Sequence, residues 1–280
     1  MKIIYPGIKQ AISLCIMLLL LQLLAGAILG LLFPIEGLES FNENNIIKEL
    51  SNNIAVLLPS IIVILLGFKR AELSFHEVFR FDTFQKEFIL PIIIAVFGFG
   101  IVSSEADNVF RYFLPMPDFI YEIFKDLFTG SMITVIMIAL IVPICEETIF
   151  RGLILNGFLS RYSEKKSILI SALMFMLIHL NPYQFFSAFL GGVFLACIYY
   201  VTRSLWLCIF AHALNNFSPF FFGKILGLEI PGFIHSDFQP VHGEFQPLWL
   251  DIMGIVMLAL GIYYFIKKAG NDNLSQRINS

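Results

Sequence analysis

Ionisable and amide side chains are rare in the strongly apolar stretches of this sequence, and six of them are candidates for chemistry. They are Glu146, Glu147, Arg151, His179, His212 and Asn216. A charged side chain at the centre of a bilayer is unfavourable by at least about 2.5 kcal/mol on insertion scales, so these residues are functional candidates. Carboxylate and imidazole groups exchange protons with a reacting water, and an amide nitrogen donates hydrogen bonds. Together they are what a water-containing cavity inside a membrane would need.

The spacing of these residues along a helix assigns them to different faces. Glu147 and Arg151 are four residues apart and share a face, so we expect an ion pair. Glu146 is turned by about 100° from Glu147, and its own face offers no obvious cation. His212 and Asn216 are again four residues apart and would present an imidazole and an amide together.

The depth of the candidates, counted along the predicted helices, brings them to one level. At a rise of about 1.5 Å per residue, the carboxylates, both histidines and Asn216 lie roughly 12–20 Å from the cytoplasmic ends. Phe175 lies one turn before His179 and could form a wall of the same space. A purely structural interpretation is open for each residue, because Glu147 with Arg151 could simply tighten the bundle. A lone His or Asn could simply join two helices.

The elements that must position these residues are membrane helices. Hydrophobic residues make up 58% of the 280 residues and charged ones 14%, whereas a soluble domain carries roughly a quarter charged residues. We predict an all-α fold, a polytopic bundle of about eight transmembrane helices, because only helices satisfy the backbone of such spans in lipid. The spans are 11–33, 53–68, 87–104, 131–158, 167–181, 183–202, 204–222 and 248–266.

The distribution of charge predicts how the bundle is oriented. Of the 18 Lys and Arg residues, one lies within a span and four fall in segments predicted outside: Lys48, Arg111, Lys125 and Lys224. The remainder fall on the cytoplasmic side, together with both termini. We therefore predict a multi-pass protein of the cell membrane, with 1–280 forming a single transmembrane domain. The first helix is expected to stay uncleaved rather than to act as a signal peptide. The segment 105–130 contains an amphipathic pattern, typical of a helix that lies on the outer interface or caps the bundle.

Three motifs, in order, resemble the CPBP family, the CaaX-protease and bacteriocin-processing membrane proteins also called Abi proteins. The family pattern is EExxxR, then FxxxH, then HxxxN. This sequence supplies Glu146-Glu147-xxx-Arg151, Phe175-xxx-His179 and His212-xxx-Asn216. The resemblance covers 131–222, the predicted CPBP-like catalytic core, and three ordered motifs on membrane helices are highly specific.

The resemblance implies an intramembrane endopeptidase, a hydrolase that cleaves a peptide bond of a membrane-associated protein or peptide. In the family's prenyl-processing members the first Glu and the first His activate water, which here are Glu146 and His179. The second His and the Asn, here His212 and Asn216, would stabilise the oxyanion of the tetrahedral intermediate. Three further residues would support them: Glu147, Arg151 and Phe175.

A zinc-dependent version of the same protease is an alternative. Glu146, His179 and His212 could make a site with two His, one Glu and an open position for water. However, the HExxH motif is absent and Asn is a poor zinc ligand. A glutamate mechanism without metal or other cofactor is therefore favoured.

Two alternatives from other classes remain at this stage. A non-catalytic membrane protein, such as a bacteriocin-immunity or scaffold protein, would not need the complete set of motifs. A transporter would be expected to show paired repeats with broken helices, and the sequence has none. The formal charge of −3 shows no basic patch for nucleic acid. The predicted partners are the lipid bilayer and a membrane-associated peptide or protein substrate.

Overall fold

A computed structural model describes residues 5–278, apart from 33–42, 73, 80–84 and 236–242. Within these residues the chain forms helices, with one isolated β-bridge between Ile230 and Ile234. The all-α prediction is confirmed. The helical elements, in chain order, are α1 (Ile8–Leu32), α2 (Glu43–Ala71), α3 (Phe75–Phe79), η2 (Lys86–Phe88), α4 (Ile89–Phe113), α5 (Asp118–Thr129), α6 (Met132–Ile136), η3 (Met137–Ile141), α7 (Val142–Glu147), η4 (Thr148–Leu155), α8 (Asn156–Leu159), α9 (Glu164–Leu177), α10 (Pro182–Thr202), α11 (Leu205–Pro219), η5 (Phe220–Ile225) and α12 (Leu248–Ile278).

Seven helical segments of the described residues are long and apolar enough to cross a membrane: Ile8–Leu32, Glu49–Ala71, Lys86–Phe113, Met132–Leu159, Pro182–Thr202, Leu205–Ile225 and Leu248–Gly270. They correspond to seven of the eight predicted spans, although residue 33 lies outside the described residues. The one predicted span without a counterpart is 167–181, where the structure has the helix α9. It has 14 residues, and at about 1.5 Å per residue it is too short to cross a hydrocarbon core of about 30 Å.

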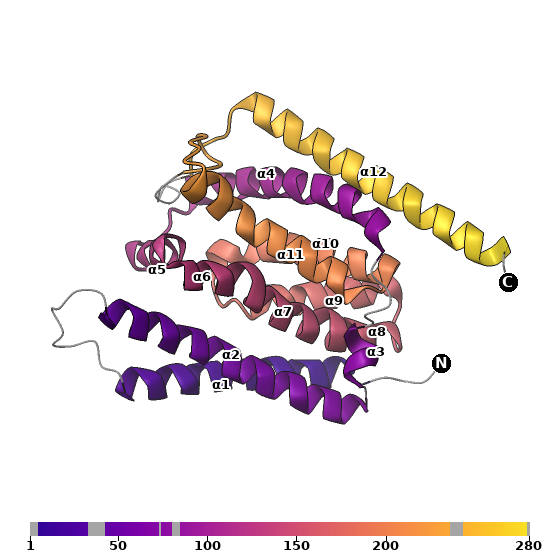
Figure 1. The fold of residues 1–280 in the computed structure, drawn as a ribbon, viewed down its shortest axis with the longest axis horizontal. Coiled ribbons are helices and arrows are strands. Elements are labelled where there is room, and N and C mark those ends of the chain that lie inside the picture. The colour runs from indigo at the N-terminus through magenta and orange to yellow at the C-terminus, as the bar shows by residue number, and fades with distance from the viewer. Residues whose placement is uncertain (1–4, 33–42, 73, 80–84, 236–242, 279–280) are drawn as a thin grey trace.

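The helices lie roughly along one direction in three groups (Figure 1). The pair α1 and α2 lies on one side and the pair α4 and α12 on the other, with α6 to α11 between them. The beginning of α1 and the end of α12 lie at the same end of the bundle. Which end faces the cytoplasm stays a prediction, and the charge count behind it includes Lys2 and Arg80, which lie outside the described residues.

Close packing of α4 against α12 depends on glycine. A Cβ added at Gly98 would stand 2.3 Å from the backbone nitrogen of Leu258, and one at Gly261 would stand 2.5 Å from the nitrogen of Ala95. Helices in lipid associate through packing rather than through the hydrophobic effect, and small residues let their backbones approach. These contacts fix α4 beside α12, and α4 supplies one wall of the candidate site.

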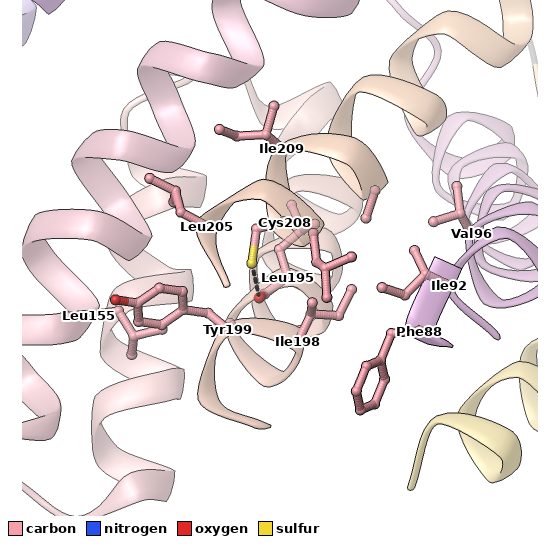
Figure 2. Packing of buried hydrophobic residues seen from close by; sticks show 13 residues of the cluster. Phe88, Ile92, Val96, Leu155, Leu195, Ile198, Tyr199, Leu205, Cys208 and Ile209 are labelled. Carbon is pink, nitrogen blue, oxygen red and sulfur yellow. Dashed lines mark hydrogen bonds between the residues drawn. The ribbon is translucent and has the colours of Figure 1, made fainter. Parts of the chain in front are cut away.

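A buried apolar cluster joins α4, α10 and α11, as Figure 2 shows. Its members include Ile92 of α4, Leu195 of α10 and the fully buried Cys208 of α11. The thiol of Cys208 donates to the carbonyl oxygen of Leu195 at 3.5 Å, across the two helices. Since His212 follows Cys208 by one turn of α11, this cluster holds the helix that presents His212.

Candidate active site

All four residues predicted to be catalytic line one cavity of about 320 Å³ inside the bundle. Glu146 comes from α7, and His212 and Asn216 come from α11. His179 comes from the turn between α9 and α10. Phe175, near the end of α9, lines the same cavity. Three segments far apart in the sequence thus bring acid, imidazole and amide groups to one space.

The second glutamate of the motif, Glu147, is fully buried and holds two cationic or potentially cationic groups. Its Oε1 accepts from Nη1 of Arg151 at 2.9 Å and from Nδ1 of His212 at 2.8 Å. The predicted ion pair between Glu147 and Arg151 is therefore confirmed. The contact with His212 was not predicted from the sequence, since it joins residues that are 65 positions apart.

Arg151 ties this network to two further helices. Its Nη2 donates to the carbonyl oxygen of Gly192 in α10 at 3.0 Å, and its guanidinium lies 4.7 Å from the ring centre of Phe175. A Cβ added at Gly192 would stand 3.1 Å from Ala172 of α9, so the absence of a side chain lets α9 and α10 pack closely there. A cation this deeply buried is tolerated because it is paired and hydrogen-bonded.

The contact with Glu147 fixes how His212 faces the cavity. A carboxylate can only accept, so Nδ1 of His212 carries the proton of that hydrogen bond. The other ring nitrogen, Nε2, then lies 3.7 Å from Oε2 of Glu146. That separation exceeds a hydrogen bond. Glu146 was predicted to have no obvious cation on its own face of the helix, and the neighbour that the structure gives it comes from another helix, α11.

His179 lies in a non-helical turn, because α9 ends at Leu177 and α10 begins at Pro182. Leu180 has a φ of 49°, and the side chain of Asn181 caps α10 by accepting from the backbone nitrogen of Tyr183 at 3.1 Å. Irregular backbone at membrane depth is tolerated where it is buried in protein or lines a water-filled cavity. The turn of His179 lines the cavity.

The imidazole of His179 is held by its own helix. Its Nδ1 lies 2.8 Å from the carbonyl oxygen of Phe175, and since a carbonyl only accepts, Nδ1 is the donor. Nε2 of a neutral His179 therefore has a free lone pair. Within the described residues, Glu146 and His179 form no direct hydrogen bond. The ring of Phe175 stands edge to face with those of both His179 and His212, at 5.1 and 5.9 Å between centres.

Asn216 is oriented by an interruption of the fourth span. Pro143 has no N–H, so the carbonyl of Ile138, five residues earlier, lacks the partner that a π-helix would give it. The segment η3 before Pro143 is π-helical. Nδ2 of Asn216 donates to the carbonyl oxygen of Ile138 at 3.1 Å. One N–H of the amide is thereby used for orientation, and the second remains for another acceptor.

Several polar residues of the cavity were missed by sequence reasoning: Ser103, Gln184, Ser187 and Asn215. Asn215 stands beside the motif residue Asn216 and donates to its Oδ1 at 3.5 Å. Polar residues directly after the apolar run that ends in His179 are a signal that could have indicated Gln184. Ser103 carries no such signal, because a serine in an apolar helix often bonds its own backbone.

The arrangement of ligand-type side chains bears on the zinc alternative. Among the described residues, no group of three or more His, Cys, Asp or Glu side chains is arranged so that it could hold a metal ion. Nδ1 of each active-site histidine donates to another group, to Glu147 in His212 and to a backbone carbonyl in His179, which leaves Nε2 as the nitrogen available to a ligand. The described side chains do not stand in a three-ligand arrangement, and whether the activity depends on metal stays a prediction.

The chain is thus a polytopic helical membrane protein with an acid, imidazole and amide cavity in its interior. Residues 128–218 match the sequence model of the family described as Rce1-like, type II CAAX prenyl endopeptidase. This match confirms the resemblance to the CPBP family in the segment that holds the three motifs.

Other comparisons are more distant. A protein of Mycoplasma capricolum subsp. capricolum, described as an uncharacterized protein, is 24% identical over 214 residues, which cover 69% of this chain and 61% of that protein. The chain thus matches less than two thirds of the length of this relative. No solved structure matches the chain.

Proposed function

We propose that this chain is an intramembrane endopeptidase in which Glu146 acts as the general base. The family match of residues 128–218 supports protease chemistry. The observation that carries the proposal is the convergence of Glu146, His179, His212 and Asn216 on one cavity. Glu147 and Arg151 lie outside that cavity and have a positioning role, because they are the buried partners that orient His212.

The reaction uses one water and one peptide bond. The water oxygen attacks the carbonyl carbon while the carboxylate of Glu146 takes a proton from the water. His179, through its free Nε2, accepts a hydrogen bond from the second O–H of the water and orients it, and that hydrogen stays on the attacking oxygen. The carbonyl electrons move onto oxygen, which gives a tetrahedral oxyanion. Glu146 then returns its proton to the peptide nitrogen, the C–N bond breaks, and the acid and amine products leave.

Two donors would stabilise the oxyanion. Asn216 offers the N–H that is not used by Ile138. His212 can donate from Nε2 only as an imidazolium, since its Nδ1 proton is already engaged by Glu147. In that state Arg151 and His212 carry two positive charges, and Glu146 and Glu147 carry two negative ones. Negative charge moves from Glu146 to the oxyanion during attack, so the cluster stays neutral overall. Hydrogen-bond donors that are fixed in a site without bulk water lower the free energy of the transition state most when they lie where such charge develops.

The proposal can be tested with purified protein in detergent and a random peptide library. Wild-type protein is expected to generate new peptide termini, which mass spectrometry detects, whereas Glu146→Gln is expected to generate none. Equal cleavage by both proteins would remove Glu146 from the mechanism. No cleavage by either protein, at any peptide length, would favour the non-catalytic membrane protein instead.

A further inference from the structure

A second and larger cavity, of about 740 Å³, adjoins the candidate active site. The two cavities share four lining residues: Ser103, Gln184, Ser187 and Asn215. The larger cavity extends from this shared wall toward the end of the bundle at which α5 lies. Phe124 of α5 and Met116 line it there. We refer to it below as the outer cavity.

The walls of the outer cavity differ in chemistry. Aromatic and sulfur side chains line one part, among them Phe97 of α4, Phe222 of η5, and Trp249 and Met253 of α12. Unbranched Met side chains adapt to ligands of different shape, and aromatic rings provide large apolar contact areas. The shared wall is polar instead. An occupant must therefore have apolar side groups and a polar part that reaches toward the active site.

A loop whose residues Ile230 and Phe233 line the outer cavity is fixed to α4. The carbonyl oxygen of Gly232 accepts from Nδ2 of Asn108 at 2.6 Å and from Oγ of Ser104 at 3.1 Å. Gln246 donates to the same oxygen at 3.5 Å. Three helix or loop donors on one carbonyl hold this wall in place, so the cavity is a formed part of the bundle.

The shared wall offers both donors and acceptors. Oγ of Ser103 donates to the carbonyl of Gly100, and Oγ of Ser187 donates to the carbonyl of Gln184, each at 3.2 Å, which leaves the lone pairs of both oxygens available. The oxygen of the Gln184 side chain accepts from Asn181 at 3.4 Å. Its amide nitrogen has no partner among the described residues, so it can donate to a ligand.

We propose that the outer cavity binds the apolar peptide segment that flanks the scissile bond of the substrate. This inference rests on the proposed function. A peptide drawn into the bilayer needs partners for its own N–H and C=O groups, each of which is costly to leave unpaired in lipid. Gln184, Asn215 and the two serines supply such partners where the segment passes from the outer cavity to Glu146. Apolar side chains of the segment pack against Phe97, Phe222 and Trp249.

Trp249 makes direct detection of this binding possible. The chain has two tryptophans, Trp206 and Trp249, so Trp206→Phe leaves the one that lines the outer cavity. The protein also carries Glu146→Gln, which prevents turnover. The probe is a dansyl-labelled nonapeptide of Leu, Ala and Ser, and energy transfer from Trp249 to dansyl reports binding in detergent. Undecanoic acid with the same label is the acyl-chain probe.

Three variants define where the peptide binds. Gly100 lines the outer cavity, and a Cβ added there meets only Oδ1 of Asn215, at 3.9 Å, so Gly100→Leu is chosen to place a side chain in the cavity. Gln184→Leu removes a donor of the shared wall. Gly26→Leu is the control, because Gly26 is exposed on α1 and a Cβ there meets nothing within 4 Å.

The peptide is expected to bind saturably and to be displaced by unlabelled peptide. Gly100→Leu should weaken its binding at least about tenfold, and Gln184→Leu about fivefold, as for the loss of one hydrogen bond. Gly26→Leu should match the parent protein. The proposal is overturned if Gly100→Leu binds the peptide as tightly as Gly26→Leu does, with both proteins folded by thermal melting. It is also overturned if the acyl-chain probe binds as tightly as the peptide and Gln184→Leu weakens the binding of neither. That result would indicate a lipid site.

Because this measurement reads binding in a variant without turnover, it fails independently of the proposed function. Peptide binding that responds to Gly100→Leu, in a protein whose wild type cleaves nothing, would retain the outer cavity as a peptide site and reject the protease. Cleavage by the wild type together with unchanged peptide binding in Gly100→Leu would retain the protease and reject the outer cavity as its peptide site.

Discussion

Nδ1 of His212 lies 2.8 Å from Oε1 of Glu147, a carboxylate that is fully buried. The same oxygen accepts from Arg151 at 2.9 Å. One carboxylate oxygen thus orients the imidazole that faces the cavity and neutralises the buried guanidinium. The two adjacent glutamates therefore have different surroundings, since Glu146 is partly exposed to the cavity and Glu147 is not.

The network around Glu147 predicts a strong stability coupling. Glu147→Ala and Arg151→Ala should each lower the free energy of unfolding by about 3–5 kcal/mol, because each leaves one buried charge without its partner. The double variant should lose much less than the sum of the two. Denaturation in detergent measures all three. Additive losses would mean that the pair contributes no coupling and that Arg151 stabilises the protein through its contacts with Gly192 and Phe175.

The same network predicts a catalytic effect through His212. Glu147→Gln keeps the side-chain shape but removes the negative charge that favours an imidazolium at His212. Turnover should fall by at least about tenfold with little change in KM, because the variant no longer orients His212 through a carboxylate. Glu122→Gln is the control, since Glu122 is exposed on α5, where its carboxylate lies 4.0 Å from Nζ of Lys125. An unchanged kcat for Glu147→Gln, with a lower free energy of unfolding, would leave Glu147 with a structural role only.

Asn216 is predicted to act mainly in the transition state. Asn216→Ala should lower kcat by about 10²–10³ with a small change in KM, as for removal of one oxyanion donor. Steady-state kinetics on a peptide identified from the library measures both constants. A rise in KM at constant kcat would assign Asn216 to substrate binding instead.

Chelation and elemental analysis test whether the activity depends on zinc. If Glu146 and His179 activate water unaided, prolonged chelation should leave activity intact, and elemental analysis should find well under one zinc per chain. His212→Ala should then lower kcat without changing the metal content. Loss of activity on chelation, recovery with zinc and loss of metal in His212→Ala would favour the zinc mechanism and make His212 a ligand.

The sequence predicted the helical class and the faces of the fourth helix well, because both depend on local pattern. Long apolar runs in lipid leave the backbone no alternative to helix, and the four-residue spacing of Glu147 and Arg151 does not depend on tertiary structure. The span predicted at 167–181 illustrates the limit. An apolar count does not detect that the chain turns at His179, where Leu180 takes a positive φ and Asn181 caps the next helix.

Contacts between helices could not be predicted from one sequence. The bond between His212 and Glu147 requires α11 and α7 to pack in one register, and the bond of Asn216 to Ile138 requires the π-helical segment before Pro143. The neighbour of Glu146 could not be predicted for the same reason, since only tertiary packing brings Nε2 of His212 near it. The catalytic roles of the four cavity residues stay predictions.

The most direct test of the account compares membranes from cells that produce the wild type with membranes from cells that produce Glu146→Gln. Quantitative mass spectrometry of new protein termini in the two samples is the measurement, with Glu122→Gln as the matched control. The account predicts a set of termini that appears with the wild type and with Glu122→Gln and is absent with Glu146→Gln, at equal amounts of folded protein. The same termini in all three samples would contradict the central role of Glu146.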